Sequence, residues 1–86
     1  MYYVYMLESE LDGDIYKGIT FDYIKRLEQH NEGSSKFTKS KRPWRLIFVQ
    51  VVQTKKDALQ EEKRLKKCNK KYLVWLIGQK VNILNN

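Results

Sequence analysis

With 86 residues, the chain is shorter than most domains and has room for one compact core, which excludes a division into two independent domains. Hydrophobic residues make up 42% of the sequence and no low-complexity tract interrupts them, which excludes an intrinsically disordered chain. The formal net charge of +7 points to a polyanionic partner, either nucleic acid or an acidic membrane surface. Cys68 is the only cysteine, so an intrachain disulfide framework and a multi-cysteine zinc site are both excluded.

The N-terminus and the spread of apolar residues give no sign of export or membrane insertion. Acidic residues follow the apolar start of the chain too closely for a signal peptide, and no run of about 18 apolar residues occurs. A lone cysteine also suits a reducing compartment. We therefore expect a cytoplasmic protein with one domain over residues 1–80 and a short polar tail over residues 81–86.

The predicted elements are short strands and helices. In chain order they are a strand over residues 2–8, a strand over 15–19, a helix over 22–31, a basic loop over 36–45, a strand over 46–52, a helix over 54–67 and a helix over 69–78. The turn signal Asp12-Gly13 indicates that the first two strands form an antiparallel hairpin. The order β-β-α-β-α-α is typical of an α+β domain, here a small three-stranded antiparallel sheet with flanking helices.

Two tyrosines of the hairpin are candidates for chemistry. Because side chains alternate along a strand, the Tyr5 and Tyr16 side chains could face each other across the two paired strands. Composition alone favours core or cross-strand packing as the role of these tyrosines. A tyrosine that acts as a base near neutral pH needs nearby positive charge, which Lys17, Arg26 or a metal ion would supply.

Arg26 and His30 lie four residues apart on the helix predicted over residues 22–31, so their side chains project from one face. A guanidinium grips phosphate with two hydrogen bonds, and an imidazole moves protons near neutral pH. The alternative is an amphipathic helix whose Arg and His only reach solvent.

Glu62 lies on the apolar side of the helix predicted over residues 54–67. The spacing that places Ala58, Leu59 and Leu65 against the core places this carboxylate on the same stripe. A buried carboxylate without a partner is costly, so a positive group should meet it. Two interpretations stay open, namely an edge carboxylate paired with Arg or Lys, and an oxygen ligand for a divalent metal ion.

The loop over residues 36–45 combines basic side chains with Phe37 and Trp44, and no acidic residue occurs between Glu32 and Asp57. This composition favours contacts to a phosphate backbone together with base stacking, although a solvated basic face without a partner is the alternative. The residues expected to contact nucleic acid are Lys17, Lys36, Thr38, Lys39, Lys41 and Arg42. Membrane binding by the basic region from Lys63 to Lys71 is disfavoured, because Glu62 would enter the lipid with the apolar stripe.

Taken in order, several segments resemble the motifs of the GIY-YIG nuclease family, especially its small bacterial members related to the N-terminal nuclease domain of the excision-repair subunit UvrC. They are Tyr2-Tyr-Val-Tyr-Met-Leu7, Tyr16-Lys-Gly-Ile-Thr20, the helix around Arg26 and His30, the basic segment over residues 36–46 and Asp57-Ala-Leu-Gln-Glu-Glu-Lys63. The first motif reads Tyr-Val-Tyr instead of Gly-Ile-Tyr, and the second has Lys17 where the family often has an aliphatic residue. The five segments together cover the chain from Tyr2 to about Ile77.

The resemblance implies an endonuclease that hydrolyses phosphodiester bonds of DNA, or of RNA, with one Mg²⁺ or Mn²⁺ ion. It makes Tyr5 the candidate base or relay, Arg26 the phosphate-binding residue and Glu62 the metal ligand, while Tyr16 and His30 position the reacting groups. Substrate specificity would come from a protein partner or a second copy of the chain. A non-catalytic nucleic-acid-binding module with the same fold is the alternative.

Overall fold

A computed structural model describes residues 1–86, with three strands and three α-helices. The strands are β1 (Tyr2–Ser9), β2 (Ile15–Thr20) and β3 (Trp44–Val52), the α-helices are α1 (Tyr23–Glu32), α2 (Lys55–Lys66) and α3 (Lys70–Ile77), and two short 3₁₀ turns are η1 (Lys39–Lys41) and η2 (Ile83–Asn85). All strand pairs are antiparallel, and the sheet order is β2-β1-β3. The predicted α+β class and element order are confirmed. None of the helices is long and apolar enough to cross a bilayer.

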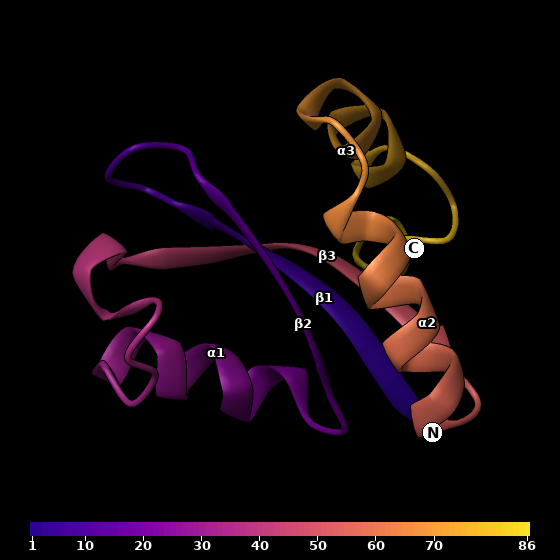
Figure 1. Cartoon of the computed structure of the whole chain (residues 1–86), viewed down its shortest axis with the longest axis horizontal. Helices are drawn as coiled ribbons and strands as arrows, with labels where there is room; N and C mark the ends of the chain where they lie inside the picture. The colour runs from indigo at the N-terminus through magenta and orange to yellow at the C-terminus, as the bar shows by residue number, and fades with distance from the viewer.

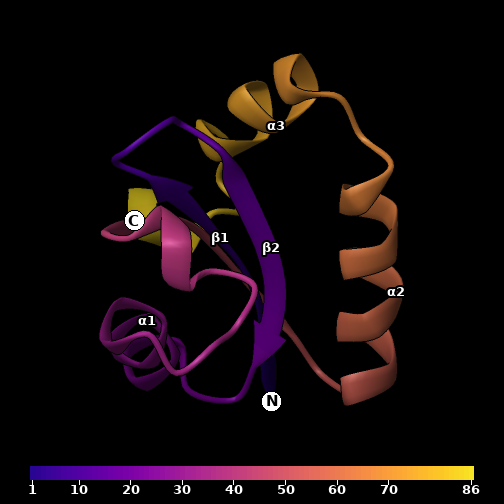
Figure 2. The same cartoon turned by 60° about the vertical axis from the view of Figure 1, so that its left-hand side comes forward.

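The central strand β1 separates two layers of helices (Figure 1). Val4 and Met6 point toward α2 and α3, where they pack with Phe48, Ala58 and Leu65. The alternate residues of β1 point the other way and pack toward α1, which is why four consecutive residues of this strand are buried. Figure 2 shows the edge strand β2 lying between α1 on one side and α2 on the other.

Local sequence signals fix where the helices begin and end. Asp22 caps α1 by accepting a hydrogen bond from the backbone N–H of Lys25 at 3.0 Å, and Thr54 caps α2 through the N–H of Asp57 at 3.1 Å. Helix α1 ends at Gly33, whose φ of 84° lies in the left-handed region that favours glycine. These caps place α1 across one face of the sheet, with its last turn toward the hairpin.

Two sequence predictions about packing are wrong. Leu59 was expected in the core but is 47% exposed, because the buried line of α2 runs through Ala58 and Leu65 and Leu59 lies about 100° around the helix from Ala58. Trp44 was expected in a nucleic-acid-binding loop, yet it begins β3 and is only 5% exposed. Its indole packs in the layer between the sheet and α1.

The residues after Gly78 pack against the sheet and do not form the free polar tail that the sequence predicts. Asn82 is buried, and its side-chain oxygen accepts a hydrogen bond from the backbone N–H of Val49 at 3.1 Å. Its amide nitrogen donates to the carbonyls of Ile47 at 3.0 Å and Ile77 at 2.9 Å. Asn82 therefore joins the outer edge of β3 to the end of α3.

Replacing Asn82 should destabilise the protein measurably. In Asn82→Ala the N–H of Val49 loses its partner while staying buried, which costs roughly 1 to 3 kcal/mol of unfolding free energy. Urea denaturation followed by circular dichroism measures the change. Asn86→Ala, at the exposed end of the chain, is the control and should leave the midpoint unchanged. Equal stability of the two variants would contradict the role of Asn82.

Candidate active site

The Tyr5 ring lies across Gly18 on the edge strand. The two residues are register partners between β1 and β2, and a Cβ atom at position 18 would lie only 2.6 Å from the Tyr5 hydroxyl oxygen. Only glycine leaves room for the ring to extend over β2 in this way. The hydroxyl therefore reaches the free edge of the sheet although Tyr5 itself is 1% exposed.

A buried hydrogen-bonded chain leads away from that hydroxyl. Tyr5 Oη lies 2.9 Å from His30 Nε2, and His30 Nδ1 lies 2.7 Å from Thr38 Oγ1. The Thr38 hydroxyl faces the carbonyl of Ser35 at 3.5 Å, to which it donates its proton. Thr38 is then the acceptor for Nδ1–H, so Nε2 of His30 carries no proton and accepts from Tyr5.

Burial sets the protonation states in this chain. It raises the pKa of Tyr5 to about 12, against the effect of the nearby Arg26 guanidinium and with smaller contributions from Tyr16 and Glu62. Burial also lowers the pKa of His30 to about 4, and the positive charge of Arg26 adds to this effect. At neutral pH, Tyr5 is therefore a neutral phenol and His30 a neutral imidazole.

Aromatic packing holds the imidazole in place. The Tyr16 ring packs edge-on against His30, with ring centroids 5.0 Å apart, and edge-on against Trp44, with ring centroids 6.3 Å apart. The indole N–H of Trp44 donates to the carbonyl of Thr38 at 2.8 Å. The side chain of Asn31 clamps the backbone of Trp44 through two bonds of 2.6 and 3.0 Å, which ties α1 to β3.

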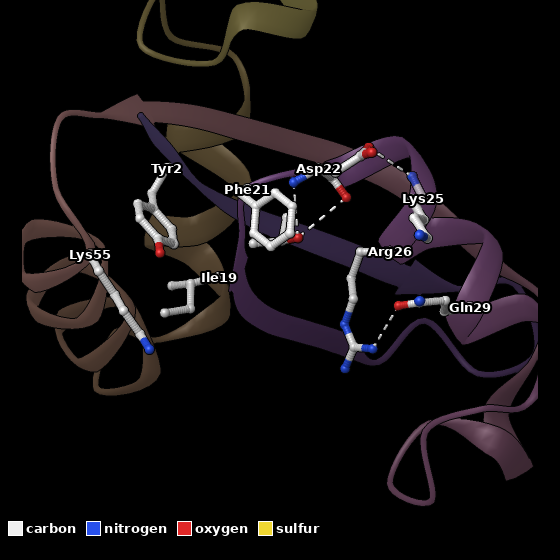
Figure 3. A pocket seen from close by; sticks show the side chains of 9 residues that line it. Tyr2, Ile19, Phe21, Asp22, Lys25, Arg26, Gln29 and Lys55 are labelled. Atoms are coloured by element: carbon white, nitrogen blue, oxygen red, sulfur yellow. Dashed lines mark hydrogen bonds between the residues drawn. The ribbon is translucent and has the colours of Figure 1, made fainter.

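Arg26 lies between the buried chain and an open hollow. Its guanidinium is close enough to lower the pKa of Tyr5 and that of His30, while its Nη1 donates to Gln29 Oε1 at 3.0 Å. The hollow has a volume of about 500 Å³, and the Arg26 side chain forms one wall of it (Figure 3). A phosphate at this wall would meet a positive group next to the Tyr5 hydroxyl.

The adjacent carboxylates of Glu61 and Glu62 face different surroundings. Glu61 accepts hydrogen bonds from Gln50, at 3.0 Å, and from Arg64. Burial alone would raise the pKa of Glu61, but these two bonds outweigh it, so the pKa lies below its usual range. Glu62 has a side chain that is 19% exposed and meets only Lys66 at 3.7 Å. The negative charge of Glu62 contributes to the raised pKa of Tyr5, so Glu62 lies on the side of α2 nearer Tyr5.

The residues around Tyr5 fit weak binding of a divalent cation. No three His, Cys, Asp or Glu side chains in the chain gather around one point, so Glu62 would be a single protein anchor. Mg²⁺ commonly keeps several waters and uses one or two carboxylates together with substrate phosphates. The Glu62 carboxylate has no close hydrogen-bond donor, unlike that of Glu61, and is free for such a contact.

Two of the residues expected to contact nucleic acid are bonded within the protein, and a third, Lys17, lies on the face of the sheet away from Tyr5. Thr38 is fully buried and bonds to His30, so its burial does not fit a direct contact. Lys41 pairs with Asp12 at 3.0 Å and also with Asp14, which raises the pKa of the lysine and fixes the loop to the β1–β2 turn. Lys17 shares the β2 face that looks toward α2, opposite Met6 and away from Tyr5.

Lys36, Lys39 and Arg42 are exposed, as a phosphate-binding surface requires. Arg42 donates from Nε to the carbonyl of Lys39 at 2.8 Å and packs over Gly33, which orders the loop. Phe37 is 86% exposed on the same loop. Sequence reasoning identified these exposed residues, but it missed the supporting roles of Asn31 and Thr38, whose only signal is their position beside the predicted helix and loop.

The pH dependence of stability should report the burial of His30. Its pKa is about 4 in the folded protein against an ordinary value of 6.5, so below pH 6.5 the unfolded chain takes up a proton that the folded chain excludes. The unfolding free energy should therefore fall by about 2 kcal/mol between pH 7 and pH 5. Urea unfolding at the two pH values measures this, with His30→Asn as the variant that lacks the effect. The same pH dependence in both proteins would show that the ring is not held neutral.

Comparison with known proteins shows the family to which the chain belongs. The GIY-YIG catalytic domain family matches residues 1–75. A UPF0213 protein of Syntrophus aciditrophicus is 38% identical over 79 residues, covering 90% of each chain, and UPF0213 protein YazA of Bacillus subtilis is 40% identical over 72 residues, covering 83% of this chain and 73% of YazA. The solution NMR structure of the UPF0213 protein BH0048 from Bacillus halodurans superimposes with a TM-score of 0.61 at 30% identity, covering 99% of this chain and 92% of that one. The chain therefore belongs to the GIY-YIG family of nuclease domains.

Proposed function

We propose that the protein is a metal-dependent endonuclease that hydrolyses phosphodiester bonds in DNA. The observation that carries the proposal is the buried chain from Tyr5 through His30 to Thr38, which ends at a sheet edge next to Arg26 and Glu62. A fold alone needs no such chain, because an apolar residue would fill the position of His30 with less desolvation. The polar chain and the charges of Arg26 and Glu62 that act on Tyr5 support a site for a phosphate.

Each side chain has a chemical task in this proposal. Arg26 holds the scissile phosphate and stabilises the negative charge that grows on it during hydrolysis. Tyr5 accepts a proton from the attacking water as it passes its own proton to the unprotonated Nε2 of His30. Tyr16 and Thr38 keep the imidazole oriented, so they act as positioning residues.

Glu62 would hold Mg²⁺ or Mn²⁺ beside the same phosphate, where the ion supplies Lewis-acid stabilisation. With one carboxylate as its protein anchor, the ion should bind weakly until the phosphate oxygens of the substrate complete its coordination. Exposed Lys36, Lys39 and Arg42 supply sequence-independent contacts to the nucleic-acid backbone. Specificity beyond this would need a partner or a second copy.

Replacing Glu62 should abolish cleavage. Purified protein is incubated with labelled single-stranded, duplex and branched DNA in Mg²⁺, Mn²⁺ or chelator, next to Glu62→Gln. Loss of a ligand worth several kcal/mol should slow cutting by about 100-fold or more. Glu61→Gln is the matched control, because the neighbouring carboxylate pairs with Arg64 and Gln50, and it should cut normally. Equal effects of the two variants would remove Glu62 from the metal site.

Tyr5→Phe tests the proton relay while keeping the ring over Gly18. The variant should retain its fold and its affinity for DNA, since only the hydroxyl is lost, but its cleavage rate should fall by roughly 10²- to 10⁴-fold. Rates under metal saturation, together with the urea midpoint, separate chemistry from stability. Full cleavage by Tyr5→Phe would exclude the hydroxyl from the reaction.

The exposed basic loop supports a second candidate, a non-catalytic module that docks on nucleic acid. Lys36, Phe37 and Lys39 form a binding surface whether or not the chain cuts. Such binding weakens with salt and needs no divalent ion, whereas cleavage requires one. Salt-sensitive binding without cutting of any substrate would favour the docking module.

A further inference from the structure

Apart from Arg26, the residues that line the hollow have no part in the chemistry proposed above. It lies where β2 ends and the first turns of α1 and α2 come together, with a volume of about 500 Å³. Its main walls are Tyr2, Ile19, Phe21, Lys25, Arg26 and Lys55. The volume lies within the range of about 300 to 1,000 Å³ that is usual for small-molecule sites, and so is large enough for a nucleotide.

Its apolar floor and cationic rim come from different elements. Tyr2, Ile19 and Phe21 lie between the side chains of Lys55, from α2, and Arg26, from α1, in Figure 3. Asp22 is the one acidic group at the hollow, and its carboxylate is bonded to the backbone N–H of Lys25. The rim therefore suits an anion, while the floor suits a flat apolar ring.

Phe21 is exposed to solvent on a backbone held by hydrogen bonds. Its side chain is 76% exposed, although large aromatic residues usually bury most of their surface. The backbone on either side is held by the Thr20 hydroxyl, which accepts from the N–H of Asp22 at 3.1 Å and donates to its carbonyl at 3.2 Å. Because the backbone beside Phe21 is already held, only the side-chain torsions of the ring remain to be ordered when another ring stacks on it.

We propose that this hollow binds an unpaired nucleobase, that of the nucleotide adjacent to the phosphate held by Arg26. The base stacks on Phe21, and Lys55, on the side of the hollow opposite Arg26, contacts the phosphate beyond it. The inference rests on the proposed function for the position of the scissile phosphate. It adds the substrate class, because a base that enters the hollow cannot stay paired and stacked in a duplex.

The preference for unpaired substrate follows from the cost of extraction. Taking a base out of a duplex costs a few kcal/mol, which a single-stranded segment avoids. Stacking on an aromatic side chain contributes roughly 1 to 3 kcal/mol per base. The hollow therefore selects single strands, or junctions with an unpaired nucleotide at the cleavage point, over regular duplex.

Metal-free binding tests this without requiring cleavage. Fluorescence anisotropy in chelator measures the affinity for a short labelled oligothymidylate, for an abasic oligomer with the same phosphates, and for duplex. Phe21→Ala should weaken oligothymidylate binding by roughly 5- to 100-fold and leave the abasic oligomer and duplex unaffected. Phe21→Tyr should restore binding, because it keeps the ring.

Trp75→Ala is the matched control, since Trp75 is an aromatic residue 56% exposed on α3 and outside the hollow. Unchanged oligothymidylate binding by Phe21→Ala, or a loss equal to that of Trp75→Ala, would overturn the inference. The inference would also be overturned if the wild-type protein bound the abasic oligomer as tightly as the oligothymidylate. Phe21-dependent binding by a protein that cuts nothing would instead contradict the nuclease proposal and leave the base site standing.

Discussion

The passage of the Tyr5 ring over Gly18 is the constraint on which the site depends. It carries a hydroxyl from the central strand to the edge of the sheet, where a phosphate has access, while the ring stays in the core. His30 must then be buried to meet that hydroxyl, and Thr38 must be buried to satisfy His30. No buried side-chain nitrogen or oxygen is left without a partner, so the polar interior is complete.

The same packing explains how helices on opposite faces of the sheet contribute side chains to the surroundings of Tyr5. Helix α1 supplies Arg26 and His30 from one face of the sheet, and α2 supplies Glu62 from the other. The edge strand β2 lies between the two helices (Figure 2), and Gly18 on this strand leaves room for the Tyr5 ring to extend over it. Each helix is positioned by its own apolar layer, so the distance between the two sets of groups depends on the thickness of the sheet and its packing.

Local patterns in the sequence predicted the parts of this arrangement that depend on short-range geometry. Strand alternation placed Tyr5 with Tyr16, and the spacing of four residues placed Arg26 with His30; the structure brings these four together. The pairing of Lys41 with Asp12 and Asp14, and the burial of Thr38 and Trp44, depend on how the loop folds back onto the hairpin. Helical phase and the matching place in the motif favoured Glu62 over Glu61. The sequence did not predict that Gln50 on β3 and Arg64 on α2 would occupy the Glu61 carboxylate.

The two edges of the sheet differ in a way that bears on self-association. Asn82 occupies the outer backbone groups of β3 around Val49, so an incoming strand cannot pair there without displacing a buried amide. The outer edge of β2 has no neighbouring strand, and it is the edge that carries Gly18 beneath the Tyr5 hydroxyl. Dimers formed by extending the sheet along β2 would therefore cover the Tyr5 hydroxyl, so under the proposed function nucleic acid and a second copy of the chain would compete for this edge.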